Sequence, residues 1–126
     1  MLDNSLPADV LREIGMPPRY KGYAYLLFML QQTQKDPDLV YNLCNGLYPL
    51  ATAHFQVPGC NLERNIRFAI NRTWEHGNQQ NLSRLFAAYD IDRTPSISEF
   101  LAILTEAMLF NRTRSRVRRR RQKEQA

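Results

Sequence analysis

The spacing of apolar residues in the segment NLERNIRFAINRTWEHG, residues 61–77, constrains the fold more than any other feature of the sequence. One stripe at helical spacing contains Leu62, Ile66, Ala69, Ile70 and Thr73, with Trp74 at its margin. The other long segments share this period, and none alternates convincingly between apolar and polar residues. The sequence therefore predicts an all-α protein, a compact bundle of about six to seven helices that contains a helix-turn-helix.

Capping residues and helix breakers set the expected boundaries of the helices. Asn4 or Ser5 can cap the first helix, and Gly15 ends it ahead of two prolines. Pro49 suits the first turn of a short fourth helix, and Gly77 ends the fifth. The remaining helices are expected at about residues 20–35 and 39–46, from Gln80 or Asn81, and after a cap at Ser96 or Ser98.

The net charge of +5 is divided very unevenly along the chain. Residues 1–109 contain nine Lys and Arg against eleven Asp and Glu, whereas residues 110–126 contain eight Lys and Arg against one Glu. We therefore expect a slightly acidic helical domain over residues 1–109 and an arginine-rich C-terminal tail over residues 110–126. Two interpretations of the tail stay open, a solvated disordered end or a set of phosphate contacts. The candidate contacts are Arg112, Arg114, Arg116, Arg118, Arg119, Arg120 and Arg121.

Residues that carry catalytic or metal chemistry are sparse. The soft ligands Cys44, His54, Cys60 and His76 match no zinc spacing, so we expect no metal site. The carboxylates are scattered, and no glycine-rich loop is suited to a phosphate-bearing cofactor. We therefore expect neither an enzyme nor a cofactor.

The same sequence argues against a membrane or secreted protein. No apolar run approaches the ~20 residues of a membrane span, and the N-terminus has no signal-peptide pattern. The two cysteines form no disulfide framework, which favours a cytoplasmic location. Aromatic residues at helical spacing between Tyr20 and Phe28 suit a core and its rim better than a platform for single strands.

The fourth and fifth helices, joined by QVPG, have the dimensions of a helix-turn-helix. The face opposite the apolar stripe of the fifth helix presents Arg64, Arg67, Phe68, Asn71 and Glu75. In this motif the second helix enters the major groove, where an arginine can pair with guanine and Glu63 could accept from cytosine. Two alternatives stay open: an ordinary two-helix corner, and a Glu63–Arg67 pair that is only a surface salt bridge.

Four runs extend this interpretation, namely REIGMPPRYKGYAYL, LYPLATAHF, LERNIRFAINRTWEHGN and PSISEFLAIL, at residues 12–26, 47–55, 62–78 and 95–104. Together they resemble the family of C-terminal effector domains of stage zero sporulation protein A, over about residues 10–109. The resemblance implies an all-α DNA-binding domain that recognises TGTCGAA-like boxes, often in tandem pairs, and regulates transcription by engaging RNA polymerase.

The resemblance also suggests roles for residues of the fifth helix. Glu63 and Arg64 match positions of base-edge contact, and Arg67 matches a basic residue that faces DNA. Asn61 lacks the cationic contact that the family usually has nearby, and Phe68 replaces a residue that is usually His. The family's receiver domain does not precede this segment, which leaves two alternatives, a stand-alone, divergent relative or a domain excised from a longer protein. Without the phosphoacceptor of that domain, we expect DNA binding to need no phosphodonor.

We therefore expect a sequence-specific transcriptional regulator whose partner is double-stranded DNA. Asn61, Glu63, Arg64, Arg67, Phe68 and Asn71 would form its contact face. RNA polymerase and a second copy of the chain, as a tandem homodimer on DNA, are further expected partners. One alternative is a protein-interaction module that modulates a regulator or polymerase without specific DNA binding. Another is a less specific nucleic-acid binder driven by the arginine tail.

Overall fold

The computed structural model describes residues 5–109. The predicted all-α fold is confirmed, since these residues form six α-helices and no strand. The helices are α1 (Ser5–Glu13), α2 (Lys21–Lys35), α3 (Tyr48–Phe55), α4 (Gly59–His76), α5 (Gln79–Ala87) and a last helix over residues 97–109. The candidate cap Asn4 and the tail arginines lie outside the described residues.

The predicted third helix is wrong as an α-helix. Two short helical segments replace it, the 3-10 helix η2 (Pro37–Tyr41) and the π-helical turn η3 (Leu43–Leu47). Asn42 separates them with a non-helical backbone, at φ −132° and ψ 55°. Its carbonyl oxygen then accepts from the amides of both Gly46 and Leu47, each at 3.0 Å, which widens the following turn.

Three helix starts are now fixed by their caps. The DNA-facing candidate α4 begins at Gly59, two residues before the predicted Asn61, because the extended Pro58 precedes its first turn. Asn78 caps α5 by accepting from the Asn81 amide at 3.0 Å, so α5 begins at Gln79 and not at the predicted Gln80 or Asn81. The predicted cap at Ser96 is confirmed, since its Oγ accepts from the Glu99 amide at 3.1 Å.

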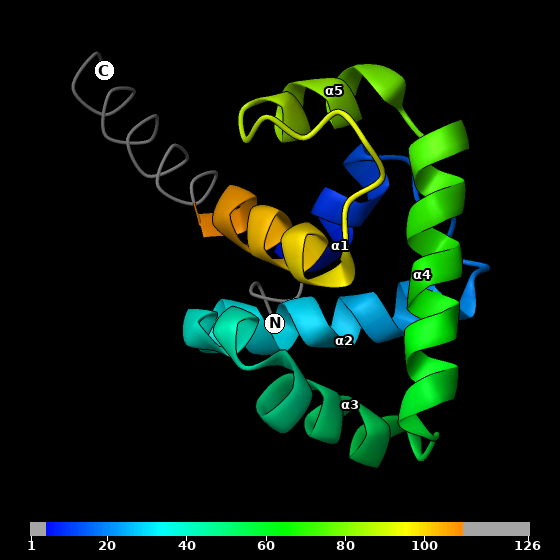
Figure 1. Cartoon of the computed structure of the whole chain (residues 1–126), viewed down its shortest axis with the longest axis vertical. Coiled ribbons are helices and arrows are strands. Elements are labelled where there is room, and N and C mark those ends of the chain that lie inside the picture. Colours follow the sequence, from blue (N-terminus) through cyan, green and yellow to red (C-terminus); the bar gives the residue numbers. More distant parts are fainter. Residues whose placement is uncertain (1–4, 110–126) are drawn as a thin grey trace, which may run out of the picture.

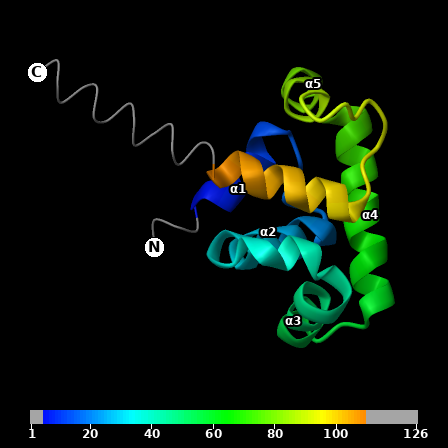
Figure 2. The ribbon, with the colours of Figure 1, turned by 60° about the vertical axis from the view of Figure 1, so that its left-hand side comes forward.

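The helix α4 runs along one side of the molecule, and most of the other helices meet it along its length (Figure 1). The second view shows the same order, with α5 at one end of α4, the last helix and α2 near its middle, and α3 at the other end (Figure 2). The core lies between α4 and these elements. Its fully buried large side chains include Leu11, Leu26, Met29, Leu30, Leu62, Ile66, Phe86, Phe100 and Leu101.

The helices α2 and α4 approach each other closely at Gly22. A Cβ atom added to Gly22 would lie 2.3 Å from the Asn65 carbonyl oxygen and 2.7 Å from the Ala69 Cβ. Only the absence of a side chain allows the backbones to pass at this distance. The first turn of α2 is therefore fixed against the middle of α4.

The far end of α4 is fixed by α1. The Asn78 amide donates to the Ile14 carbonyl at 2.9 Å, and the Asn81 side-chain amide donates to the Glu13 carbonyl at 2.7 Å. Gly15, at φ 81°, turns the chain there, and a Cβ on it would lie 2.7 Å from the Asn78 nitrogen. These contacts link the C-terminus of α1 to the α4–α5 junction, so α4 is held at its middle and at its C-terminal end.

Candidate nucleic-acid interface

The helices α3 and α4 form the predicted helix-turn-helix. Gln56 ends α3 in the left-handed conformation, at φ 55° and ψ 49°, and its amide donates to the Thr52 carbonyl. Val57 and the extended Pro58 complete the turn before α4 begins. Phe55 packs edge-on against Tyr25 of α2, with ring centroids 4.7 Å apart, so the short helix α3 is anchored to the core.

The two faces of α4 match the helical-wheel prediction. Its buried residues are the predicted stripe, Leu62, Ile66, Ala69, Ile70 and Thr73. On the opposite face Asn61, Arg64, Arg67, Phe68 and Asn71 are exposed, whereas Glu63 is partly exposed and lies at the margin of the buried stripe, about 20° from Ile70. Phe68 keeps 52% of its surface accessible, and other large apolar side chains of this domain, such as Leu50 and Tyr41, are also exposed, at 44% and 88%. The structure therefore brings five of the six predicted contact residues onto the exposed face of α4, with Glu63 at its edge.

Glu63 and Arg67 form an ion pair across one turn of α4, with Nη2 and Oε1 2.5 Å apart. The surface salt bridge that the spacing allowed is thus present. The Arg67 side chain nevertheless stays 66% exposed, and a pair of this kind contributes little to stability. Arg64 makes no ion pair with any residue that the structure describes.

Tyr48, at the start of α3, lies beside this pair and was missed by the sequence analysis. Its pKa is raised to about 12, mainly because the phenol is half-buried. The negative charge of Glu63 also raises the pKa, a smaller effect comes from Cys44, and Arg67 lowers it. Tyr48 therefore stays protonated at neutral pH, a neutral hydroxyl within electrostatic range of Glu63 and Arg67.

A shallow groove runs beside one edge of the exposed face of α4. Its volume is about 320 Å³, and it is lined by Arg67, Ile70 and Asn71 of α4, by residues 93–96 of the loop before the last helix and by Ile97, the first residue of that helix. The guanidinium of Arg93 donates to both carboxylate oxygens of Glu99, at 3.0 and 2.9 Å. Arg93 was also missed, although the Ser96–Glu99 spacing of a capping box was visible in the sequence.

The hydrogen bonds from Arg93 and Ser96 change the acidity of Glu99. The pKa of Glu99 falls from 4.5 to about 2, chiefly because the Arg93 guanidinium donates to the carboxylate and further because the Ser96 amide donates to it. Glu99 is therefore ionised throughout the neutral range. Arg93 consequently lies at the rim of the groove as a partly neutralised cation.

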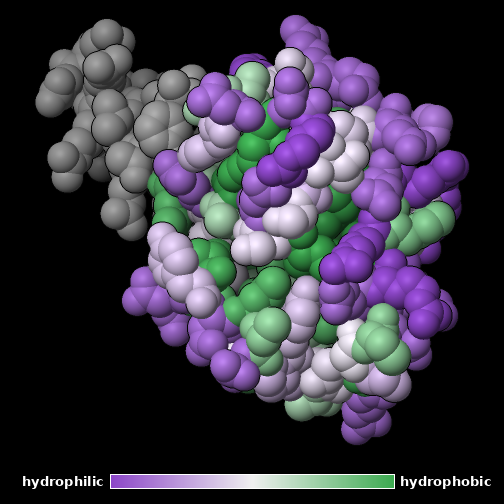
Figure 3. All heavy atoms as spheres, viewed as in Figure 1, coloured by the Kyte–Doolittle hydropathy of each residue, from purple (hydrophilic) through white to green (hydrophobic). Residues whose placement is uncertain are grey.

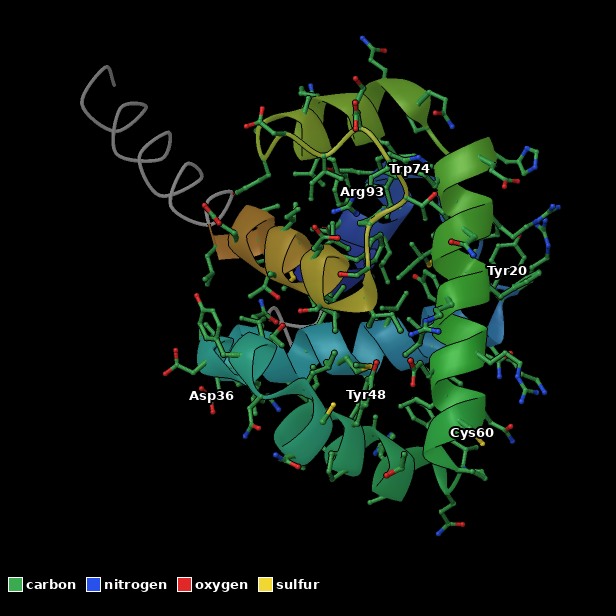
Figure 4. The ribbon with its side chains drawn as sticks, viewed as in Figure 1. Tyr20, Asp36, Tyr48, Cys60, Trp74 and Arg93 are labelled. Atoms are coloured by element: carbon green, nitrogen blue, oxygen red, sulfur yellow. The ribbon has the colours of Figure 1, made fainter. Side chains whose placement is uncertain are left out.

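The other edge of the exposed face meets the turn that precedes α2. The rings of Tyr20 and Phe68 are 5.4 Å apart and nearly perpendicular, at 81°. The guanidinium carbon of Arg19 lies 5.1 Å from the centroid of the Tyr20 ring. Tyr20 and Arg93 thus lie on opposite sides of α4 (Figure 4).

The surface over α4 is dominated by hydrophilic residues, while most of the hydrophobic surface visible from this side lies over the neighbouring helices (Figure 3). The helix contributes three arginines and two glutamates, a net charge of +1, to a domain whose net charge is −2. The helix α2, with two lysines and no acidic residue, carries a net charge of +2, so net charge alone does not distinguish α4.

Metal and membrane chemistry find no support in the part of the chain that the structure describes. Over residues 5–109 no three His, Cys, Asp or Glu residues gather as metal ligands. His54 stacks on Phe28, with centroids 4.2 Å apart, and the exposed cysteines 44 and 60 are free thiols. Over the same residues, none of the helices has the length and apolar character that crossing a membrane requires.

Comparison with known protein families agrees with this geometry. Residues 8–108, which include all six α-helices except the first residues of α1 and the last residue of the final helix, match a family model. That family is described as the sporulation initiation factor Spo0A C terminal. The match extends over the whole helix-turn-helix and both of its flanks.

Proposed function

Because the chain belongs to the family of sporulation initiation factor Spo0A C-terminal domains, we propose that it is a sequence-specific regulator of transcription that recognises DNA with α4. Membership of this family supports a DNA-binding regulator of transcription, since the domains of this family bind DNA and regulate transcription. The finer proposal is that the exposed face of α4 enters the major groove of a TGTCGAA-like box.

One observation carries the proposal, the two-sided character of α4. The residues of its inner stripe are buried in the core, whereas Arg64, Arg67 and Asn71 are exposed on its outer face. The helix α4 is also the second helix of a helix-turn-helix. A helix with its side chains is about 10–12 Å wide, and the major groove is about 12 Å wide. The protruding α4 can therefore insert without rearrangement of the core.

Roles follow from the position and chemistry of each side chain. Arg64 is exposed and forms no ion pair among the described residues, and it would make a bidentate contact with guanine from the second turn of α4. Glu63 would accept from a cytosine amine, and Asn71 would bond an adenine edge or a phosphate. Phe68 would contact a thymine methyl group, and Asn61 would approach the DNA from the first turn of α4.

Arg67 has a different role, because it begins paired with Glu63. Contact with a phosphate would replace one charge-assisted bond of Arg67 with another and would release Glu63 toward a base. Phosphate contacts position a protein on DNA without carrying sequence information. Loss of Arg67 should therefore weaken binding to every duplex alike.

The proposal includes partners beyond the duplex. RNA polymerase would be engaged by the DNA-bound protein, and two copies would occupy tandem boxes as a homodimer. Such a regulator would work in the cytoplasm, associated with the nucleoid. The alternative of a pure protein-interaction module predicts no difference between box and scrambled DNA, which the following competition measures.

Competition between duplexes tests the proposal. A labelled box-containing duplex is bound by the full chain and competed with unlabelled box or scrambled DNA at fixed salt. The box should compete more strongly, and Arg64→Ala should reduce this discrimination by about 1–3 kcal/mol. Arg12→Ala is the matched control, since it removes an exposed arginine of α1 that pairs with Asp9. Equal competition by both duplexes with the wild-type chain would favour the interaction module or the tail-driven binder.

A further inference from the structure

The turn before α2 contains two cations that have no assigned role. Arg19 and Lys21 are both exposed, and neither forms an ion pair with any residue over the described range 5–109. Between them Tyr20 is half-buried and adopts an extended backbone, at φ −77° and ψ 136°. A solvated turn would leave all three side chains without tertiary contacts, but this one is held in place.

Contacts with α4 hold the turn. The Tyr20 ring packs edge-on against Phe68, and the Arg19 guanidinium lies over the Tyr20 ring. Two residues further on, Gly22 brings the α2 backbone against the Asn65 carbonyl of α4. A stacked guanidinium keeps its N–H donors free around its edge. The stack therefore fixes the position of a cation while leaving its hydrogen-bonding capacity unused.

Helix geometry sets the position of the Arg19 guanidinium relative to the exposed face of α4. At about 100° per residue, Phe68 lies roughly 40° to one side of Arg64, and Arg67 roughly 60° to the other. A helix that fills the major groove has a phosphate backbone along each of its sides. The Arg19–Tyr20 stack lies on the Phe68 side, opposite the side on which Arg67 would meet the other backbone (Figure 4).

We propose that the segment Arg19–Tyr20–Lys21 is a second DNA-contacting element that binds phosphates on the Phe68 side of the groove. Arg19 supplies a charge-assisted hydrogen bond to a phosphate oxygen, and Lys21 adds a point charge at the first turn of α2. Tyr20 is a positioning residue that couples this contact to α4 through Phe68. The inference rests on the proposed function, because it uses the placement of α4 in the major groove.

Salt dependence tests the proposal. The dissociation constants of the full chain for box and scrambled duplexes are measured between 50 and 200 mM salt. Loss of one phosphate contact lowers the slope of log K against log salt by about 0.9, so the fourfold rise in salt should cost Arg19→Ala about 3.5-fold less affinity than it costs wild type. The ratio of box to scrambled binding should stay unchanged in this variant. Arg12→Ala, the charge-matched control on α1, should keep the wild-type slope.

Substitution of Tyr20 separates positioning from simple charge. Tyr20→Phe keeps the ring and should keep the slope, whereas Tyr20→Ala should lower it by the same amount as Arg19→Ala, and the two changes together should add little. An unchanged slope in Arg19→Ala overturns the inference, and if Arg64→Ala still loses discrimination, the proposed function stands. A wild-type chain without box preference defeats the proposed function instead. A folded Tyr20→Ala variant with the wild-type slope would remove Tyr20 from its positioning role.

Discussion

Replacement of Gly22 by Ala should destabilise the protein, although Ala is the better helix former. In an exposed helix the change stabilises by about 0.5–1 kcal/mol, because Gly loses more backbone entropy on folding. At Gly22 the new Cβ would lie 2.3 Å from the Asn65 carbonyl oxygen, far inside van der Waals contact. Since that oxygen belongs to the α4 backbone, a rotamer change cannot relieve the clash, and α2 must move away.

Overpacking of this kind costs about 1–3 kcal/mol. With a backbone atom as the obstacle the upper half of that range applies, so the net loss after the gain in helix propensity is about 1–2.5 kcal/mol. For a domain of this size that corresponds to a fall in Tm of about 4–10 °C. The shift of α2 should also carry Tyr20 away from Phe68 and weaken DNA binding.

Gly59 provides the matched control. It is the first residue of α4, and a Cβ there would have no neighbour within 4 Å. Gly59→Ala should therefore leave Tm unchanged or raise it slightly. Thermal melting followed by circular dichroism compares the two variants at one pH and salt concentration. A Gly22→Ala variant that melts at or above the temperature of Gly59→Ala would refute the close-packing argument.

Three further outcomes are expected. Gln56→Gly should raise the unfolding free energy by about 1 kcal/mol in urea titration, because Gln56 has φ 55° and only glycine adopts that conformation without a steric cost. Because the folded pKa of Glu99 lies near 2, below its ordinary 4.5, its ionised form stabilises the fold above pH 4.5, and this contribution is lost as the pH falls toward 2. Glu99→Gln should accordingly melt with a weaker pH dependence than wild type over that window, whereas equal profiles would contradict the Arg93–Glu99 contact. Removal of residues 110–126, which carry a net charge of +7, should weaken binding to all duplexes similarly and flatten the salt slope, and an unchanged slope would mark these arginines as solvated.

The parts of the fold that depend on local physics could be predicted from the sequence. Every residue of the inner stripe of α4 was predicted. A helix of eighteen residues makes several turns, so its apolar residues recur on one face often enough to identify the buried side. The Ser96 cap followed from local hydrogen-bonding chemistry in the same way. The start of α4 was missed by two residues, since Gly59 carries no signal of its own and only the Pro58 geometry decides.

The parts that depend on contacts between distant segments could not be predicted. The segment at residues 39–46 has apolar residues at helical spacing, yet the non-helical Asn42 divides it into η2, which contacts α2, and η3, which contacts α3. Tyr20 and Arg93 belong to turns far from α4 in sequence, and only the tertiary fold brings them to its two flanks. A helical wheel describes one helix and has no information on what lies beside it.

The same distinction explains the exposed Phe68, which is puzzling when α4 is considered alone. An apolar ring on a DNA-facing surface costs solvation in the free protein, and a histidine at this position would avoid that cost. In the folded chain about half of the ring is covered, and Tyr20 packs against one part of it. Phe68 therefore joins the proposed base-reading face to the proposed phosphate-binding turn. A substitution of Phe68 that alters base preference should therefore also move Arg19. On this side of α4, the proposed base recognition and the proposed phosphate contact depend on the same side chain.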